Sequence, residues 1–187
     1  MATRKYRKSK PRKTARRHRH STAGKIYPLL DVRSNQDLKR LEQIIKNGEL
    51  TIFMAWAKWC PHCHTMMPHF DAAAKSPNRS IQAVKVEEQM LPAVNKVLTT
   101  QINKSAKPLN VEGYPSIILI DKKGNQVTEM EPIRDTATMT KVMENAGPLA
   151  KAAGINKLAN NSAAGKNLKN SLKNTNINIF HRSIFRA

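Results

Sequence analysis

The sequence predicts an α/β domain in which a mixed sheet is covered by helices on both faces. Three observations lead to this class. Strand-like apolar runs alternate with amphipathic helical segments, a hairpin signal follows the last strong strand, and one more helical segment closes the domain. The expected order is β-α-β-α-β-α-β-β-α. Strands separated by helices favour parallel pairing and the hairpin adds antiparallel strands, so the sheet is expected to be mixed.

The first half of the domain contains two strand-like and two helical segments. Residues 26–30 include a proline and therefore suit only an edge strand. Residues 34–48 open with a Ser-x-x-Asp capping box and close with Asn-Gly, which indicates a helix. Residues 50–56 are continuously apolar, as a buried central strand is. A second helix is expected from about residue 60 to residue 74, with an internal proline that kinks it.

The second half begins with a strand at residues 81–86 and a helical pattern at residues 88–100. The turn sequence Asp-Lys-Lys-Gly-Asn then joins strands at residues 115–120 and 126–130. A last helix is expected from Thr136 to Ala146, because the Gly-Pro pair that follows ends helices.

Charge is concentrated at the two ends of the chain. The 187 residues carry 33 Lys+Arg and 13 Asp+Glu, a formal net charge of +20. Residues 1–25 contribute +11 and residues 151–187 contribute +7, both without an acid, which leaves +2 for the middle. Segments of one charge sign bury too little apolar surface to offset their ordering entropy. We therefore expect a disordered basic arm at 1–25, a domain at 26–147 and a basic Ala/Asn/Lys-rich tail at 148–187.

Composition also excludes several classes of protein. No apolar run approaches the ~20 residues that span a bilayer, so no membrane partner is expected. The basic N-terminus lacks the hydrophobic region of a secretory signal, and it has too few apolar residues for an amphipathic transit peptide. The expected location is therefore the cytosol or nucleus. Two cysteines do not make a disulfide framework, and their spacing of three indicates a reactive pair or a ligand pair.

Cys60 and Cys63 lie where the central strand gives way to the second helix. At the first turn, the Cys60 sulfur would face unpaired N–H groups and the positive end of the helix dipole, so we expect its pKa to fall below ~8.5. Cys63, one turn on, lies within disulfide reach and can resolve a mixed disulfide that Cys60 forms. Pro61 costs no hydrogen bond at a helix start. His62 can donate to the Cys60 thiolate or add positive charge.

These residues resemble the thioredoxin superfamily, which includes domains of the protein disulfide isomerase type. The resemblance rests on residues 56–71, around Trp-Cys-Pro-His-Cys, together with Val-Glu-Gly-Tyr-Pro-Ser at 111–116. It covers roughly residues 26–147 and implies a thioredoxin-like fold in which Pro115 is cis and lies against the cysteine pair. It also implies a thiol–disulfide oxidoreductase that acts on protein thiols and disulfides and needs no cofactor beyond its dithiol. The implied substrate groove contains Trp59, Pro61 and Tyr114.

The resemblance favours one redox direction, and this sequence departs from the family pattern at two places. The Pro-His dipeptide is similar to that of bacterial periplasmic oxidants and the Gly-Tyr-Pro-Ser loop to that of disulfide isomerases, which favours an oxidant or isomerase. Met54 stands six residues before Cys60, where related domains have a buried carboxylate that helps to deprotonate the resolving thiol. Lys85 would then lack its usual partner, so release of the mixed disulfide would be slow, or Lys85 would point to solvent. The connection over residues 88–110 is longer than in a minimal thioredoxin and has no assigned role.

Three other interpretations stay open. The sequence Cys-x-x-Cys-His at residues 60–64 also matches the attachment motif of a c-type haem. The two cysteines with His62, His64 or His69 form a conceivable zinc site, although no second ligand pair is present. The third alternative is a structural or interaction protein that keeps the fold without turnover.

The basic arm has the composition of a nucleic-acid-binding arm or a nuclear-localisation segment. Contacts with phosphates would be independent of sequence and strongly dependent on salt. An acidic protein surface or the inside of a capsid-like assembly would serve equally, and the Asn/Lys-biased tail is compatible with a virion protein of a large DNA virus. The residues expected to contact such an anionic partner are Arg4, Lys5, Arg7, Lys8, Lys10, Arg12, Lys13, Arg16, Arg17 and Arg19.

Overall fold

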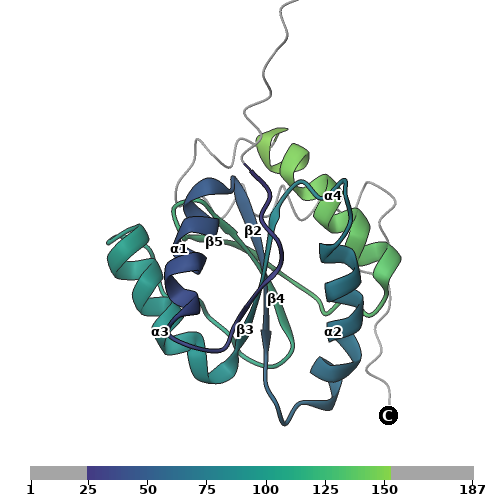
Figure 1. Cartoon of the computed structure of the whole chain (residues 1–187), viewed down its shortest axis with the longest axis horizontal. Coiled ribbons are helices and arrows are strands. Elements are labelled where there is room, and N and C mark those ends of the chain that lie inside the picture. Colours follow the sequence, from purple (N-terminus) through teal and green to yellow (C-terminus); the bar gives the residue numbers. More distant parts are fainter. Residues whose placement is uncertain (1–24, 153–187) are drawn as a thin grey trace, which may run out of the picture.

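A five-stranded mixed sheet forms the centre of the domain (Figure 1). The computed structural model describes residues 25–152. The strand order is β1-β3-β2-β4-β5, with β1–β3 and β3–β2 parallel and β2–β4 and β4–β5 antiparallel. The strands are β1 Leu30–Val32, β2 Leu50–Trp56, β3 Gln82–Glu87, β4 Ser116–Asp121 and β5 Gln126–Met130.

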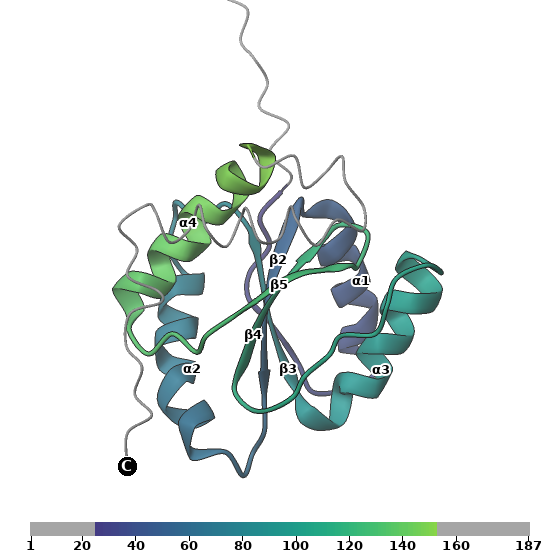
Figure 2. The ribbon, with the colours of Figure 1, turned by 180° about the vertical axis from the view of Figure 1, so that it is seen from behind.

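Helices cover both faces of this sheet, as Figure 2 shows from behind. Side chains alternate along β2, so that Ile52 and Met54 join the buried cluster under α2 and α4, whereas Phe53 joins the cluster under α1 and α3. The predicted class and element order are therefore confirmed. The helices are α1 Asp37–Asn47, α2 Pro61–Ala74, α3 Leu91–Lys96 and α4 Thr136–Ala152; a 3₁₀ turn at Glu88–Met90 precedes α3 and a π-helical stretch at Val97–Ile102 follows it.

The helix predicted at residues 88–100 is present but not regular. It opens with the 3₁₀ turn because Pro92, near the start of α3, cannot donate to a preceding α-helical turn. It ends in the wider π-helical turn, in which Val97 and Leu98 are buried and Leu98 joins the core cluster that contains Phe53. The predicted strand at residues 26–30 is displaced to Leu30–Val32, although it does lie at the sheet edge.

The prediction that Gly147-Pro148 ends the last helix is wrong. The helix continues through both residues to Ala152. Proline removes one helical hydrogen bond, but Ala146 and Ala150 on either side are buried in the core. The local breaking signal is overridden because continuing the helix keeps these two methyl groups out of water.

Candidate active site

Cys60 is the capping residue at the N-terminus of α2. Its backbone is extended, with φ −92° and ψ 105°, and Pro61 occupies the first turn, where its missing N–H costs no bond. The Cys60 sulfur accepts a hydrogen bond from the backbone N–H of Cys63, with an N–Sγ distance of 3.2 Å. The end of β2 and the first turn of α2 thus place both sulfurs together at the C-terminal end of the central strand.

The two cysteines differ in environment. Both are free thiols, and Cys63 is completely buried whereas Cys60 retains 3% of its surface. Burial, followed by the hydrogen bond with Cys60, raises the pKa of the Cys63 thiol to about 12. At neutral pH Cys63 therefore carries its proton, and Cys60 is the sulfur placed to meet a partner first.

The loop before β4 carries the motif at residues 111–116 and lies against the dithiol. The Tyr114–Pro115 peptide bond is cis, and the carbonyl oxygen of Tyr114 lies 3.4 Å from the Cys60 sulfur, which donates to it. The Ser116 hydroxyl donates to the carbonyl of Gly113 at 2.8 Å and closes the loop on itself. Two motifs about fifty residues apart in the chain therefore meet around Cys60.

Aromatic side chains form the rim beside Cys60. Trp59 is 68% exposed, and its ring and that of Tyr114 form a T-shaped pair with a centroid distance of 5.9 Å and an interplanar angle of 86°. The Trp59 indole N–H donates to the carboxylate of Glu88 at 2.6 Å. Burial and the nearby charge of Glu88 raise the pKa of Tyr114. Pro61 is exposed on the same turn.

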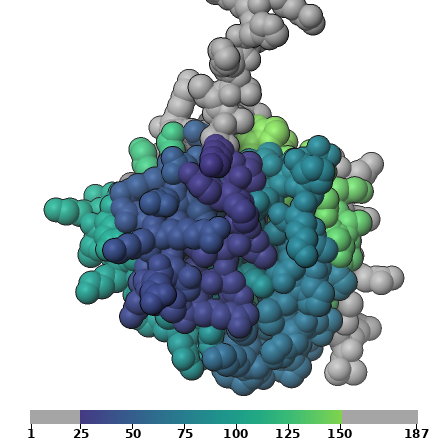
Figure 3. Space-filling view, viewed as in Figure 1, coloured from purple at the N-terminus to yellow at the C-terminus, as the bar shows by residue number. Residues whose placement is uncertain are grey.

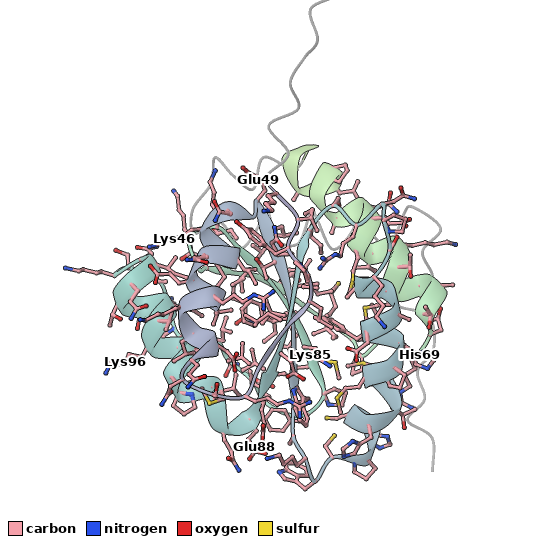
Figure 4. All side chains as sticks on the ribbon, viewed as in Figure 1. Lys46, Glu49, His69, Lys85, Glu88 and Lys96 are labelled. Carbon is pink, nitrogen blue, oxygen red and sulfur yellow. The ribbon has the colours of Figure 1, made fainter. Side chains whose placement is uncertain are left out.

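Sequence reasoning missed Glu88. It lies in the 3₁₀ turn after β3, within the connection to which no role was assigned. Its only sequence signal is a carboxylate two residues after the strand predicted at residues 81–86. Figure 4 shows Glu88 at the end of the molecule that holds the start of α2. The longer connection thus contributes a residue to the rim.

The histidines do not gather around the sulfur. His62 is exposed and makes no hydrogen bond to Cys60 within residues 25–152, where the Cys60 sulfur contacts Tyr114 and Cys63. His64 contacts the Lys58 carbonyl at 2.7 Å, and His69 contacts the Thr136 hydroxyl at 2.9 Å. Across the part of the chain that the structure describes, no group of three or more His, Cys, Asp or Glu residues could hold a metal ion.

Lys85 was expected either to lack its usual partner or to point to solvent, and the second alternative is wrong. Its side chain is 7% exposed, and the Nζ atom lies 2.8 Å from Asp71 Oδ1 and 3.5 Å from Asp31 Oδ2. Figure 4 shows Lys85 directed toward α2. Met54, opposite Lys85 in the β2–β3 register, is fully buried and supplies no charge. Carboxylates from β1 and α2 therefore take the place of one on β2.

The ten basic residues at positions 4–19 that were expected to contact an anionic partner lie outside the described residues, as does the tail from residue 153 onward. Within residues 25–152, no helix combines the length and the apolar character that a bilayer crossing requires.

Comparison with known proteins places the domain in a family. The thioredoxin family model matches residues 32–145, more than half of the chain. Protein disulfide-isomerase A4 from Rattus norvegicus is 23% identical over 113 residues, which is 60% of this chain and 16% of the relative. Thioredoxin C-3 from Corynebacterium nephridii is 26% identical over 98 residues, which is 52% of this chain and 58% of the relative.

A mutant thioredoxin from Halobacterium salinarum has a related structure, with a TM-score of 0.43, 19% identity and coverage of 65% of this chain and 95% of the other. This chain spans about a sixth of the length of the disulfide isomerases that it matches. The family match includes both motifs that meet at Cys60. The chain therefore belongs to the thioredoxin family.

Proposed function

We propose that the protein is a thiol–disulfide oxidoreductase that uses the Cys60–Cys63 dithiol on protein substrates. The observation that carries the proposal is the asymmetry of the two sulfurs. Cys60 caps α2 beside the rim formed by Trp59 and Tyr114, whereas Cys63 is buried behind it and stays protonated. The family match supports the same chemistry.

The proposed reaction has two steps that balance without a cofactor. The Cys60 thiolate attacks one sulfur of a substrate disulfide, which forms a mixed disulfide and releases the other substrate sulfur as a thiolate. Cys63 then loses its proton and attacks Cys60, which releases the second substrate thiolate and leaves a Cys60–Cys63 disulfide. Run in reverse, the same steps oxidise a substrate dithiol and return two electrons to the enzyme.

We further propose that the protein works as an oxidant or isomerase rather than as a reductant. The Pro61-His62 dipeptide between the cysteines supports this direction, because it is similar to that of bacterial periplasmic oxidants, in which a stabilised thiolate favours the reduced enzyme. A redox titration against glutathione tests it. The expected potential lies between about −180 and −120 mV, and a value near −270 mV would reject this direction while leaving the thiol chemistry intact.

The decisive experiment compares three forms of the chain in insulin reduction and in the refolding of scrambled ribonuclease. We expect Cys60→Ser to abolish both activities, because it removes the nucleophile. Cys63→Ser should accumulate mixed disulfides that gel electrophoresis resolves and that reductant releases. Activity that survives Cys60→Ser would overturn the proposed function.

A structural or interaction role is the second candidate. The absence of a carboxylate on β2 and the raised pKa of Cys63 favour it, because both slow the release of a mixed disulfide. In that case Cys60→Ser would leave partner binding unchanged.

We also propose that the basic ends hold the domain at an anionic partner, which is supported by the +11 and +7 charges of residues 1–25 and 151–187.

A further inference from the structure

Trp59 is an exposed aromatic side chain that is nevertheless held in one position. Within residues 25–152 the exposed large apolar side chains are Trp59 and Ile26, and Trp59 is the more exposed of the two. The Trp59 indole N–H donates to Glu88 Oε2, and its ring forms the T-shaped pair with Tyr114. The two contacts restrict its rotamers before any partner arrives, so a partner that packs on the indole meets a smaller entropy cost.

Glu88 brings a negative charge to these two rings. Its carboxylate accepts from the Trp59 indole, and its charge adds to burial in raising the pKa of Tyr114. The neighbouring cation, Lys58, is already paired with Glu87, with 2.9 Å between Nζ and Oε1. Among residues 25–152, no Lys, Arg or His nitrogen lies within 4 Å of the Glu88 carboxylate. In the described part of the chain, the charge of Glu88 therefore has no matching cation.

Two perpendicular aromatic rings beside a carboxylate suit a cationic side chain. The face of an aromatic ring attracts an ammonium or guanidinium group that lies within about 6 Å of the ring centroid, and tryptophan gives the strongest attraction. Trp59 presents most of its surface to solvent, and Glu88 adds a full negative charge beside the same ring. An apolar side chain could also pack on the indole, but it would leave the carboxylate without a partner. The residues present therefore favour a cation.

These rim residues lie beside the reactive sulfur. Trp59 directly precedes Cys60 in the chain, and the carbonyl oxygen of Tyr114 lies 3.4 Å from the Cys60 sulfur. Figure 4 shows Glu88 at the lower end of the molecule, and Figure 3 shows the blue-teal surface of the start of α2 at the same end. A substrate side chain that contacts the rim must therefore belong to a residue close to the cysteine that Cys60 attacks.

We propose that the rim of Trp59, Tyr114 and Glu88 selects protein disulfides in which a lysine or arginine lies beside the attacked cysteine. The inference rests on the proposed function, because it names the class of substrate that the dithiol meets. The substrate cation lies over the face of Trp59 and pairs with Glu88 Oε1, which takes part in no hydrogen bond within residues 25–152. The cation forms no covalent bond, and its role is to hold the substrate sulfur at Cys60.

Peptide kinetics test the selectivity. The substrates are disulfide-linked peptides of one sequence, with lysine or the uncharged norleucine beside the cysteine, and the readouts are KM and kcat for their reduction. An exposed cation–π contact together with an exposed ion pair should lower KM for the lysine peptide about 3- to 30-fold, with similar kcat. The ionic part of this preference should weaken between about 50 and 500 mM salt, because exposed charges are screened. Equal KM values for the two peptides would overturn the proposal.

A matched pair of variants separates recognition of a cation from support of the indole. Glu88→Gln keeps an oxygen that can accept from Trp59 but removes the charge, so the preference for the lysine peptide should fall to about that of the cation–π contact alone. Glu131→Gln removes an exposed carboxylate outside the rim and should leave the preference unchanged. A preference that survives Glu88→Gln in full, or that both variants reduce equally, would overturn the assignment of Glu88.

A single-step modification of Cys60 distinguishes this inference from the proposed function. A methanethiosulfonate reagent transfers its thiol group to the Cys60 thiolate, which forms a mixed disulfide and releases methanesulfinate, so no turnover is needed. The measurement is the ratio of the rates for a trimethylammonium reagent and a sulfonate reagent, followed by mass spectrometry. Glu88→Gln should lower this ratio several-fold relative to the parent chain.

The two possible failures differ in this measurement. A ratio that depends on Glu88 in a chain that does not reduce insulin would reject the proposed function and leave the inference standing. Insulin reduction together with a ratio that is equal in the parent chain and in Glu88→Gln would overturn the inference alone.

Discussion

Lys85 on β3 forms an ion pair with Asp71 on α2, with 2.8 Å between Nζ and Oδ1. The lysine side chain is 7% exposed, and Asp31 on β1 lies 3.5 Å away on its other side. Because Met54 faces Lys85 from β2, the cation is satisfied by carboxylates from the sheet edge and from a helix. The pair therefore ties α2 to β3 within the domain that carries the dithiol.

Removal of this cation should cost stability. We expect Lys85→Met to lower the free energy of unfolding by about 1–3 kcal/mol, because two partly buried carboxylates lose their partner. Asp71→Asn should cost less, about 1 kcal/mol, since Asp71 is partly exposed and Asp31 remains. Urea unfolding of both variants and the double variant gives the coupling energy, which should exceed about 0.5 kcal/mol. A coupling near zero would show that the pair is only a surface contact.

A carboxylate at position 54 should speed release of the mixed disulfide. Met54 belongs to the same buried cluster as Cys63, so the side chain of Met54→Glu can accept the proton that the resolving thiol must lose. We expect the release rate in single-turnover experiments to rise about tenfold or more. Met54→Gln is the control of equal size without the charge. Equal rates in the two variants would show that proton removal does not limit release.

The raised pKa of Cys63 predicts how stability depends on pH. Its ordinary value is 9.0 and its value in the fold is about 12, so above pH 9 the folded state holds more protons on this group than the unfolded state. The contribution is fully present below pH 9 and is lost as pH rises through about 12. We expect the stability difference between the reduced parent chain and Cys63→Ser to shrink over that interval. A difference independent of pH would contradict the raised value.

Local patterns predicted the elements, whereas contacts between distant segments were not predictable from them. Residues 50–56 form a hydrophobic run and residues 121–125 contain turn residues. Both signals determine the backbone conformation within a few positions of the chain. The bonds of Trp59 to Glu88 and of Lys85 to Asp71 join segments 29 and 14 residues apart, and many carboxylates in the sequence would have suited either. The dithiol was predictable because its chemistry depends on a spacing of three. The residues of the rim beside it could be identified only from the tertiary structure.

The bond from Trp59 to Glu88 should matter for substrate binding rather than for turnover. Glu88→Ala leaves the exposed indole without its acceptor, so we expect KM for an uncharged disulfide-containing peptide to rise several-fold with kcat nearly unchanged. Glu88→Gln keeps an acceptor oxygen and should change KM much less. Trp59 fluorescence anisotropy should fall in the alanine variant only. A change in kcat with constant KM would place Glu88 in the chemistry instead.

The substitution Gly147→Ala tests whether helix propensity or tertiary packing decides stability at this position. Alanine within a helix is ordinarily favoured over glycine by about 1 kcal/mol. Here a Cβ would lie 2.7 Å from the Ser80 hydroxyl and 2.9 Å from the Ser80 carbonyl oxygen, and the second contact involves backbone that cannot rotate away. We therefore expect Gly147→Ala to destabilise the domain by about 1–3 kcal/mol in thermal and urea unfolding.

Gly113→Ala is the matched control for this prediction, because a Cβ at residue 113 meets nothing within 4 Å. It should leave stability within about 0.5 kcal/mol of the parent chain. Stabilisation by Gly147→Ala would mean that α4 and the loop at Ser80 are not in contact as the structure places them. Arg79 in that loop and Gln82 at the start of β3 bind the main chain of residues 25–27. A confirmed loss at residue 147 therefore predicts that residues 25 and 152 move apart when the loop is disturbed. Energy transfer between labels at residues 25 and 152 measures that separation. The transfer efficiency should be lower in Gly147→Ala than in Gly113→Ala.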